Sequence, residues 1–170
     1  MQKKITTFLT FDDQAEEAMN FYASIFADSR IVGTTRYGDA GPGPTGQLMS
    51  ATFELAGQEF IALNGGPSFT FAQGMSLFVD CETQEEVDDL WEKLSEGGER
   101  GPCGWLEDRY GVSWQIIPRV LGEMLGDEDS ERAERVMQAM LQMSKIEIEG
   151  LREAYEGRPG ESSTSRAPTR

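Results

Sequence analysis

The stretch GWLEDRYGVSWQII, from Gly104 to Ile117, predicts two strands joined by a tight D-x-x-G turn. Tryptophans in both arms suit paired strands, because large aromatic side chains favour a pleated, half-buried surface. Successive side chains of a strand point to opposite faces, so Gln115 shares one face with Ser113 and Ile117. Trp114 points to the other face, and we expect it to lie in the core.

The same order of elements occurs twice along the chain. The first copy has a strand, an acidic amphipathic helix and three more strands, predicted at ITTFLTF, DDQAEEAMNFYASIF, RIVGTTRY, QLMSATFEL and QEFIALN. The second copy is predicted at MSLFVDC, ETQEEVDDLWEKLSEGG, GPCGWLED and VSWQII, with a shorter connection after its helix. This pattern predicts an α+β fold of two βαβββ modules, residues 3–70 and 71–118, with curved mixed sheets and helices on their outer faces.

The chain changes character after Pro118. RVLGEML predicts a short helix, and SERAERVMQAMLQMSKIEIEGLREAY predicts a long helical segment, so residues 119–156 form C-terminal helices. An apolar stripe on this segment either packs on its own domain or forms a dimer contact; it consists of Val136, Met137, Met140, Leu141 and Met143. Residues 157–170 have almost no apolar side chains and predict a disordered tail.

Charge excludes several classes of partner. The 170-residue chain has 30 acidic and 15 basic residues, a net charge of −15. Such a field repels phosphate backbones and anionic lipid, so we expect neither nucleic acid nor membrane as a partner. No segment approaches the roughly 18 apolar residues that span a bilayer, and no signal peptide is evident. Two cysteines without a secretory signal predict a cytoplasmic protein.

The absence of histidine excludes much enzyme chemistry. No Ser-His or Cys-His nucleophile pair, and no imidazole-based zinc or iron site, is possible. The glycine-rich loops that bind nucleotides are also missing. The acidic residues fall on helix faces that we expect to be solvated. Asp108 is expected to stabilise its turn, and Cys103 is expected to be a core residue.

The motif F-x-x-F-D-x-Q-A-E-E-A-x-x-F-Y, from Phe8 to Tyr22, resembles the vicinal oxygen chelate superfamily. Four further segments resemble its PhnB-like group, often labelled a 3-demethylubiquinone 3-methyltransferase domain: ALNGGPSF, CETQEEVDDLWEKLSEGGE, CGWLEDRYGVSWQIIP and RVMQAMLQMSKIEI. The resemblance covers about residues 3–155, and it implies that the two modules form their curved sheets around a cup.

In metal-using members of that superfamily, His, Glu or Gln side chains on the first, fourth, fifth and eighth strands bind a divalent metal in the cup. The matching positions here are Gln115 after the D-x-x-G turn, Thr7 to within one residue of register, Asn64, and Gly74 or Ser76. These residues are neutral and include no imidazole. We therefore expect a cavity with no metal and no other cofactor.

The resemblance implies a small organic ligand and a homodimer. The expected ligand-binding residues are Thr7, Asn64, Phe69, Ser76, Cys103, Trp105 and Gln115. One alternative is a metal-independent enzyme that uses a carboxylate or Cys103, and another is a scaffold that interacts through its acidic helices. We do not expect the methyltransferase activity, because nothing in the sequence matches a nucleotide-binding turn for S-adenosylmethionine.

Overall fold

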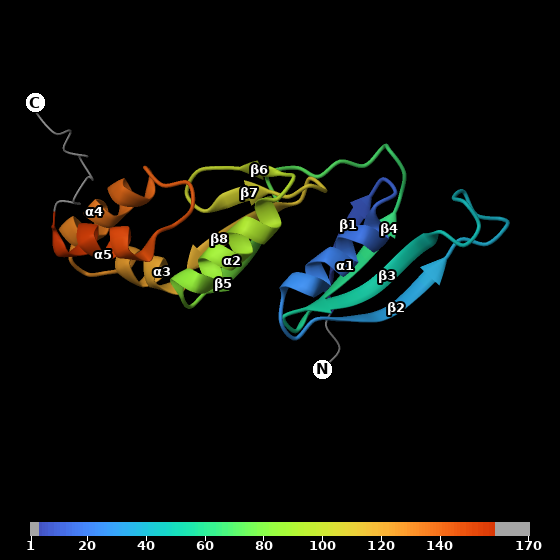
Figure 1. Ribbon diagram of the computed structural model, residues 1–170, viewed down its shortest axis with the longest axis horizontal. Helices are drawn as coiled ribbons and strands as arrows, with labels where there is room; N and C mark the ends of the chain where they lie inside the picture. The colour runs from blue at the N-terminus through green and yellow to red at the C-terminus, as the bar shows by residue number, and fades with distance from the viewer. Residues whose placement is uncertain (1–3, 159–170) are drawn as a thin grey trace, which may run out of the picture. The chain divides into compact units, whose positions relative to one another are not determined.

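The computed structural model describes residues 4–158 and confirms an α+β fold of two βαβββ modules (Figure 1). The chain divides into two compact units. The first contains Met1–Ser76, Glu96–Gly98 and Glu107–Ser113, and the second contains Leu77–Ser95, Glu99–Leu106 and Trp114–Arg170.

A four-stranded sheet forms the centre of the first unit. Its elements are β1 (Thr7–Phe11), α1 (Ala15–Ile25), β2 (Arg30–Arg36), β3 (Leu48–Leu55) and β4 (Gln58–Asn64). The strand order is β1-β4-β3-β2, with β1 parallel to β4 and the other pairs antiparallel. Because β1 and β4 are parallel, their carboxyl ends lie at the same edge of the sheet, where the loops described below begin.

Helix α1 covers one face of this sheet (Figure 1). Its apolar stripe is buried, and the sheet side chains on the same face are buried too; they include Leu9, Phe11, Ala51, Phe53, Phe60 and Ala62. The start of α1 is fixed by Asn64, whose side-chain oxygen accepts a hydrogen bond of 2.8 Å from the backbone N–H of Ala15. Asn64 thereby supplies a partner for one of the N–H groups that a helix leaves unpaired at its first turn.

The second unit is built on the other four-stranded sheet and ends in three helices. Its elements are β5 (Leu77–Cys81), α2 (Gln84–Ser95), β6 (Glu99–Arg100), β7 (Trp105–Glu107), β8 (Ser113–Pro118), α3 (Arg119–Leu125), α4 (Ser130–Met140) and α5 (Ile148–Glu156). The strand order is β5-β8-β7-β6, and β5 is parallel to β8.

Alternation along β8 agrees with the sequence. Trp114 and Ile116 are buried, whereas Gln115 and Ile117 are half-buried. The expectation that Trp114 belongs to the core is confirmed, since only 2% of this residue is exposed.

The C-terminal region contains three helices and one non-helical connection. Within the predicted helical stretch of residues 130–155, Leu141–Glu147 separates α4 from α5. Two carbonyls of this connection bond to a distant part of the second unit: Met143 and Ser144 accept hydrogen bonds from the backbone N–H groups of Cys103 and Gly104. These long-range bonds give the carbonyls partners outside the helix.

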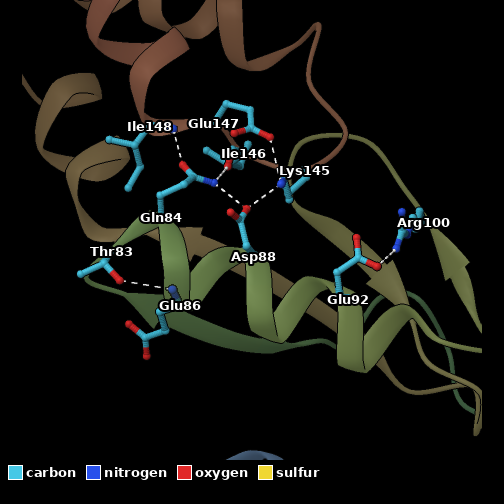
Figure 2. A network of polar contacts seen from close by, with 10 residues as sticks. All are labelled: Thr83, Gln84, Glu86, Asp88, Glu92, Arg100, Lys145, Ile146, Glu147 and Ile148. Carbon is cyan, nitrogen blue, oxygen red and sulfur yellow. Dashed lines mark hydrogen bonds and ion pairs between the residues drawn. The ribbon is translucent and has the colours of Figure 1, made fainter.

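Gln84 on α2 holds the start of α5 (Figure 2). Its side-chain oxygen accepts a hydrogen bond of 2.7 Å from the backbone N–H of Ile148, and its nitrogen donates to the carbonyl of Ile146 at 3.1 Å. Nearby, Asp88 pairs with Lys145 at 2.5 Å, and this pair lowers the pKa of Asp88 and raises that of Lys145. Ile146, between these polar contacts, is fully buried.

The apolar stripe of the C-terminal region is divided between the two interpretations. Val136 is fully buried in a core cluster with Leu121, Ile146 and Leu151, against which Met140 and Met143 pack. Met137 and Leu141 are exposed, at 40% and 57%.

The predicted tail lies outside the described residues apart from Gly157 and Arg158. Within residues 4–158, no helix has the length and apolar content needed to cross a bilayer.

Candidate functional site

A cavity of about 280 Å³ lies at the carboxyl end of β1 in the first unit. Three segments that are distant in the sequence line it: residues 10–14 at the turn from β1 to α1, residues 69–71 after β4, and the hairpin residues Glu107, Tyr110 and Gly111. The strand ends therefore place loop residues around one hollow, which is where binding residues commonly lie in folds with a rigid scaffold.

Aromatic rings form one side of this hollow. Phe11 contacts Phe71 at 5.1 Å and Tyr110 at 6.4 Å between ring centroids, both edge-on. Phe21 and Tyr22 of α1 continue the cluster behind Tyr110, at 5.8 and 6.0 Å. Phe69 lies at the rim and is 53% exposed. The hollow thus offers a fixed aromatic wall and one exposed ring.

The hairpin that carries Tyr110 is fixed by a buried aspartate. Asp108, 2% exposed, accepts hydrogen bonds from the backbone N–H groups of Tyr110 and Val112 at 2.9 and 3.0 Å. Its other oxygen accepts the hydroxyl of Tyr22 at 2.6 Å. These bonds confirm the turn-stabilising role expected for Asp108. Burial, followed by the charge of Asp108, raises the pKa of Tyr22 well above its ordinary value.

Two more contacts fix the side chains of this turn. The hydroxyl of Tyr110 donates to Glu17 of α1 at 2.9 Å, and burial, followed by this bond, raises the pKa of Tyr110 to about 12. The guanidinium of Arg109 lies over the ring of Phe21 at 4.6 Å and pairs with Glu96 at 3.1 Å. Both residues are therefore held by α1 and by the residues that follow α2 in the first unit.

The polar lining of the hollow is acidic. Asp12 and Glu107 line it, and neither carboxylate makes a hydrogen bond or ion pair with another side chain in residues 4–158. Gln14 and Thr10 add neutral polar groups. No lysine or arginine lines it. Two acidic residues thus line a hollow with an aromatic wall.

A second hollow of about 330 Å³ shares Asp12 with the first. The loop of residues 38–46 bounds it, folded around Tyr37, whose hydroxyl donates to the carbonyl of Asn64 at 2.8 Å. A side chain at Gly41 or Gly43 would overlap the Tyr37 ring, at 2.7 and 2.4 Å from its Cδ1 and Cδ2 atoms. Glycine at these two positions allows the loop to enclose the ring.

The register of the first sheet changes the predicted site. Thr7 and Asn64 lie on the same face of the sheet as Leu9, Phe11 and Ala62, and α1 covers this face. Asn64 is 5% exposed, and besides Ala15 it binds the carbonyl of Leu48 at 2.9 Å. The amide of Asn64 therefore holds backbone groups of the fold, and the residue also lines the second hollow. A ligand-binding role for Asn64 stays a prediction. On β1, the residues with the opposite facing are Phe8 and Thr10.

The other predicted residues lie in different places. Phe69 lines the first hollow. Ser76 is half-buried and is the last residue of the stretch Met1–Ser76 in the first unit. Cys103, Trp105 and Gln115 belong to the second unit, where Gln115 lies opposite Phe78 on β5. Cys103 has a positive φ of 55° and its sulfur lies 3.6 Å from the carbonyl of Met140. A ligand-binding role for these residues stays a prediction.

Sequence reasoning missed Asp12, Phe71, Glu107 and Tyr110 as lining residues. Their only signal was position: Asp12 directly follows a predicted strand, and Glu107 and Tyr110 flank the D-x-x-G turn.

The donors do not fit the divalent metal that the superfamily uses. Of the four matching positions, Asn64 is engaged by backbone groups, Thr7 faces α1, and Gln115 has the apolar Phe78 as its strand neighbour. Within residues 4–158, no group of three or more His, Cys, Asp or Glu side chains could hold a metal ion. Neutral, engaged donors of this kind are a poor match for transition metals.

Comparisons with known proteins place the chain in a family. Residues 3–117 match the family described as 3-demethylubiquinone-9 3-methyltransferase, so α3, α4 and α5 lie outside the match. The PhnB protein of Bacillus cereus is 47% identical over 68% of this chain and 99% of its own, with a TM-score of 0.63. A Pseudomonas aeruginosa protein (21% identical, 69% and 98% covered, TM-score 0.57) has the same fold.

The manganese-bound fosfomycin resistance protein FosX of Listeria monocytogenes is 18% identical over 67% of this chain and 89% of its own, with a TM-score of 0.50. No curated protein matches the chain. The chain therefore belongs to the PhnB-like family described as 3-demethylubiquinone-9 3-methyltransferase.

Proposed function

We propose that this protein binds a small organic molecule, without a metal, in the aromatic hollow of its first unit. The observation that carries the proposal is the hollow itself, in which Phe11, Phe71 and Tyr110 form a fixed wall beside the free carboxylates of Asp12 and Glu107. Apolar walls with a few placed polar groups are typical of small-molecule sites. The volume of about 280 Å³ suits a molecule of one or two rings.

The support for Tyr110 favours a preformed site. Asp108 holds the backbone of the turn, and Glu17 holds the Tyr110 hydroxyl, so the wall is in place before a ligand arrives. Rigid sites lose less conformational entropy on binding than mobile ones. Methyl transfer is not part of the proposal, because the family description is its only support.

The test is a fragment screen on the full chain, read from the backbone amide resonances of the ¹⁵N-labelled protein. We expect hits to shift residues 69–71 and 107–111 first. Replacing the exposed Phe69 by alanine should weaken these hits about three- to tenfold, the value of one aromatic contact. Phe78→Ala is the matched control, since Phe78 is also an exposed phenylalanine, at 60%, but lies on β5.

Two results would contradict the proposal. One is a screen in which no fragment shifts the hollow, and the other is an equal loss of binding in Phe69→Ala and Phe78→Ala. Elemental analysis of the purified chain tests the metal-free part separately. The residues at the four superfamily positions are poor ligands for transition metals, so we expect none. Stoichiometric zinc, nickel, manganese or iron would refute this part.

A metal-independent enzyme is the second candidate. The free carboxylates of Asp12 and Glu107 favour it, because an unpaired carboxylate beside a bound molecule can act as a general base. Conversion of a bound fragment that stops in Glu107→Gln, while binding persists, would establish this candidate. Cys103 stays the other candidate nucleophile.

We also propose a cytoplasmic homodimer. The exposed apolar side chains Phe8 and Phe78 favour association, and the free thiols of Cys81 and Cys103 suit a reducing compartment. Light scattering coupled to size exclusion gives the mass directly. A monomer at micromolar concentration would contradict the dimer.

A further inference from the structure

The acidic lining of the aromatic hollow indicates the charge of its ligand. We propose that the hollow selects planar organic cations, such as amidinium or arylammonium compounds, over neutral and anionic molecules of the same shape. This inference rests on the proposed function, because it concerns the same hollow.

The first argument is that the carboxylates lack a counter-charge. Several acidic residues of the second unit form ion pairs, as Asp88 does with Lys145 and Glu92 with Arg100. Asp12 and Glu107 have no such pair within residues 4–158. A ligand cation would supply the missing partner, and the net charge of −15 adds a favourable long-range field.

The second argument concerns two basic residues of the first unit, whose guanidinium groups pair with other carboxylates. Arg109 adjoins Tyr110 in the sequence, but its guanidinium lies over Phe21 and pairs with Glu96. Arg36 of β2 pairs with Glu16 at 2.6 Å. Neither guanidinium neutralises the hollow, and no lysine or arginine is among its lining residues.

The third argument is the aromatic wall, which favours cations independently of the carboxylates. The π faces of Phe and Tyr rings attract cations electrostatically. Phe69 is exposed, while Phe71 and Tyr110 are each edge-on to Phe11. A flat cation can stack on an exposed ring while its N–H groups point to a carboxylate. An anion of the same shape would meet repulsion from both features.

The experiment uses benzamidinium, benzamide and benzoate, which share a planar outline and differ in charge. Each is titrated into the full chain, and the dissociation constant is read from the amide resonances of residues 69–71 and 107–111. We expect benzamidinium to bind at least about tenfold more tightly than benzoate, with benzamide between them. Raising the salt from about 0.02 M to about 0.5 M should weaken only benzamidinium, because salt screens exposed charges.

Charge-removing variants locate the effect. Asp12→Asn and Glu107→Gln should each weaken benzamidinium about fivefold, the value of one unit charge at about 4 Å in water, and leave benzamide unchanged. Glu85→Gln on the surface of α2 makes the same change in net charge and is the control. The affinity of benzamidinium for this control should equal that of the original chain.

The outcomes separate the two proposals. If benzamide and benzoate shift the hollow as strongly as benzamidinium, the hollow is a binding site and the cation inference is overturned. If Glu85→Gln weakens benzamidinium as much as Asp12→Asn, only the net charge acts, and the inference is again overturned. If none of the three probes shifts the hollow, both the inference and this use of the hollow fail.

Discussion

Replacing Tyr22 by phenylalanine removes one hydroxyl from the buried core of the first unit and leaves the ring. That hydroxyl donates to the carboxylate of Asp108 at 2.6 Å, and Tyr22 is fully buried. A hydrogen bond to a charged group contributes about 1.5–3 kcal/mol. We expect Tyr22→Phe to lower the free energy of unfolding by about 2 kcal/mol.

The matched control is Tyr155→Phe on α5. The hydroxyl of Tyr155 also donates to an aspartate, Asp127, but this pair in the second unit is only partly buried. Water replaces such a bond readily, so the expected loss is below about 1 kcal/mol. The same chemical change at two depths isolates the effect of burial.

The assay combines urea unfolding, followed by circular dichroism at pH 7, with amide hydrogen exchange. Exchange is needed because a chain of two units need not unfold in one step. Protection in α1 and β1 should fall in Tyr22→Phe, while protection in α5 should not change. Equal losses in the two variants, or a loss confined to α5, would refute the role given to the Tyr22–Asp108 bond.

Three other changes test the packing and the ionisation described above. Trp114→Ala should lower the urea-derived free energy of unfolding by about 3–5 kcal/mol, because it empties a buried site. A loss below about 0.5 kcal/mol, which is typical of an exposed residue, would contradict the core position of Trp114. Gln84→Ala should reduce amide protection at the start of α5, with a loss of about 1–2 kcal/mol, since the Ile148 N–H loses its acceptor; unchanged protection would contradict this. The folded-state pKa of Tyr110, about 12, lies above its unfolded value of about 10. The contribution of this shift to the free energy of unfolding is therefore complete below pH 10 and is lost as the pH rises from 10 to 12. Urea unfolding of the original chain and of Tyr110→Phe across this range should therefore show a steeper alkaline loss in the original chain, and parallel curves would contradict the shift.

Local pattern was sufficient for much of the fold. The period-two alternation of β8 has Trp114 on one face and Gln115 on the other. It correctly predicts that Trp114 lies in the core. The repeated order of one strand, one helix and three strands also held. The first strand was harder, because FLTF has apolar residues on both faces and periodicity alone does not choose between them.

Long-range hydrogen bonds decided what the pattern did not. Leu141–Glu147 continues an amphipathic sequence, yet its backbone bonds to Cys103 and Gly104, which no local signal announces. Asn64 resembled a free polar residue at a strand end, although its amide binds two backbone groups. Asp12 and Glu107 come from the two halves of the chain, so only the fold shows that they line one hollow.

The bond between Tyr22 and Asp108 also bears on how the chain folds as it is synthesised. The two residues are 86 positions apart, so α1 leaves the ribosome long before its buried hydroxyl has an acceptor. At about 5–20 residues per second, the delay is roughly 4–17 s. During this interval, Phe11 and Tyr22 lack the Tyr110 ring that covers them in the finished unit. The aromatic cluster of the first unit is therefore complete only after the D-x-x-G hairpin has been synthesised, so the first module cannot reach its final packing on its own.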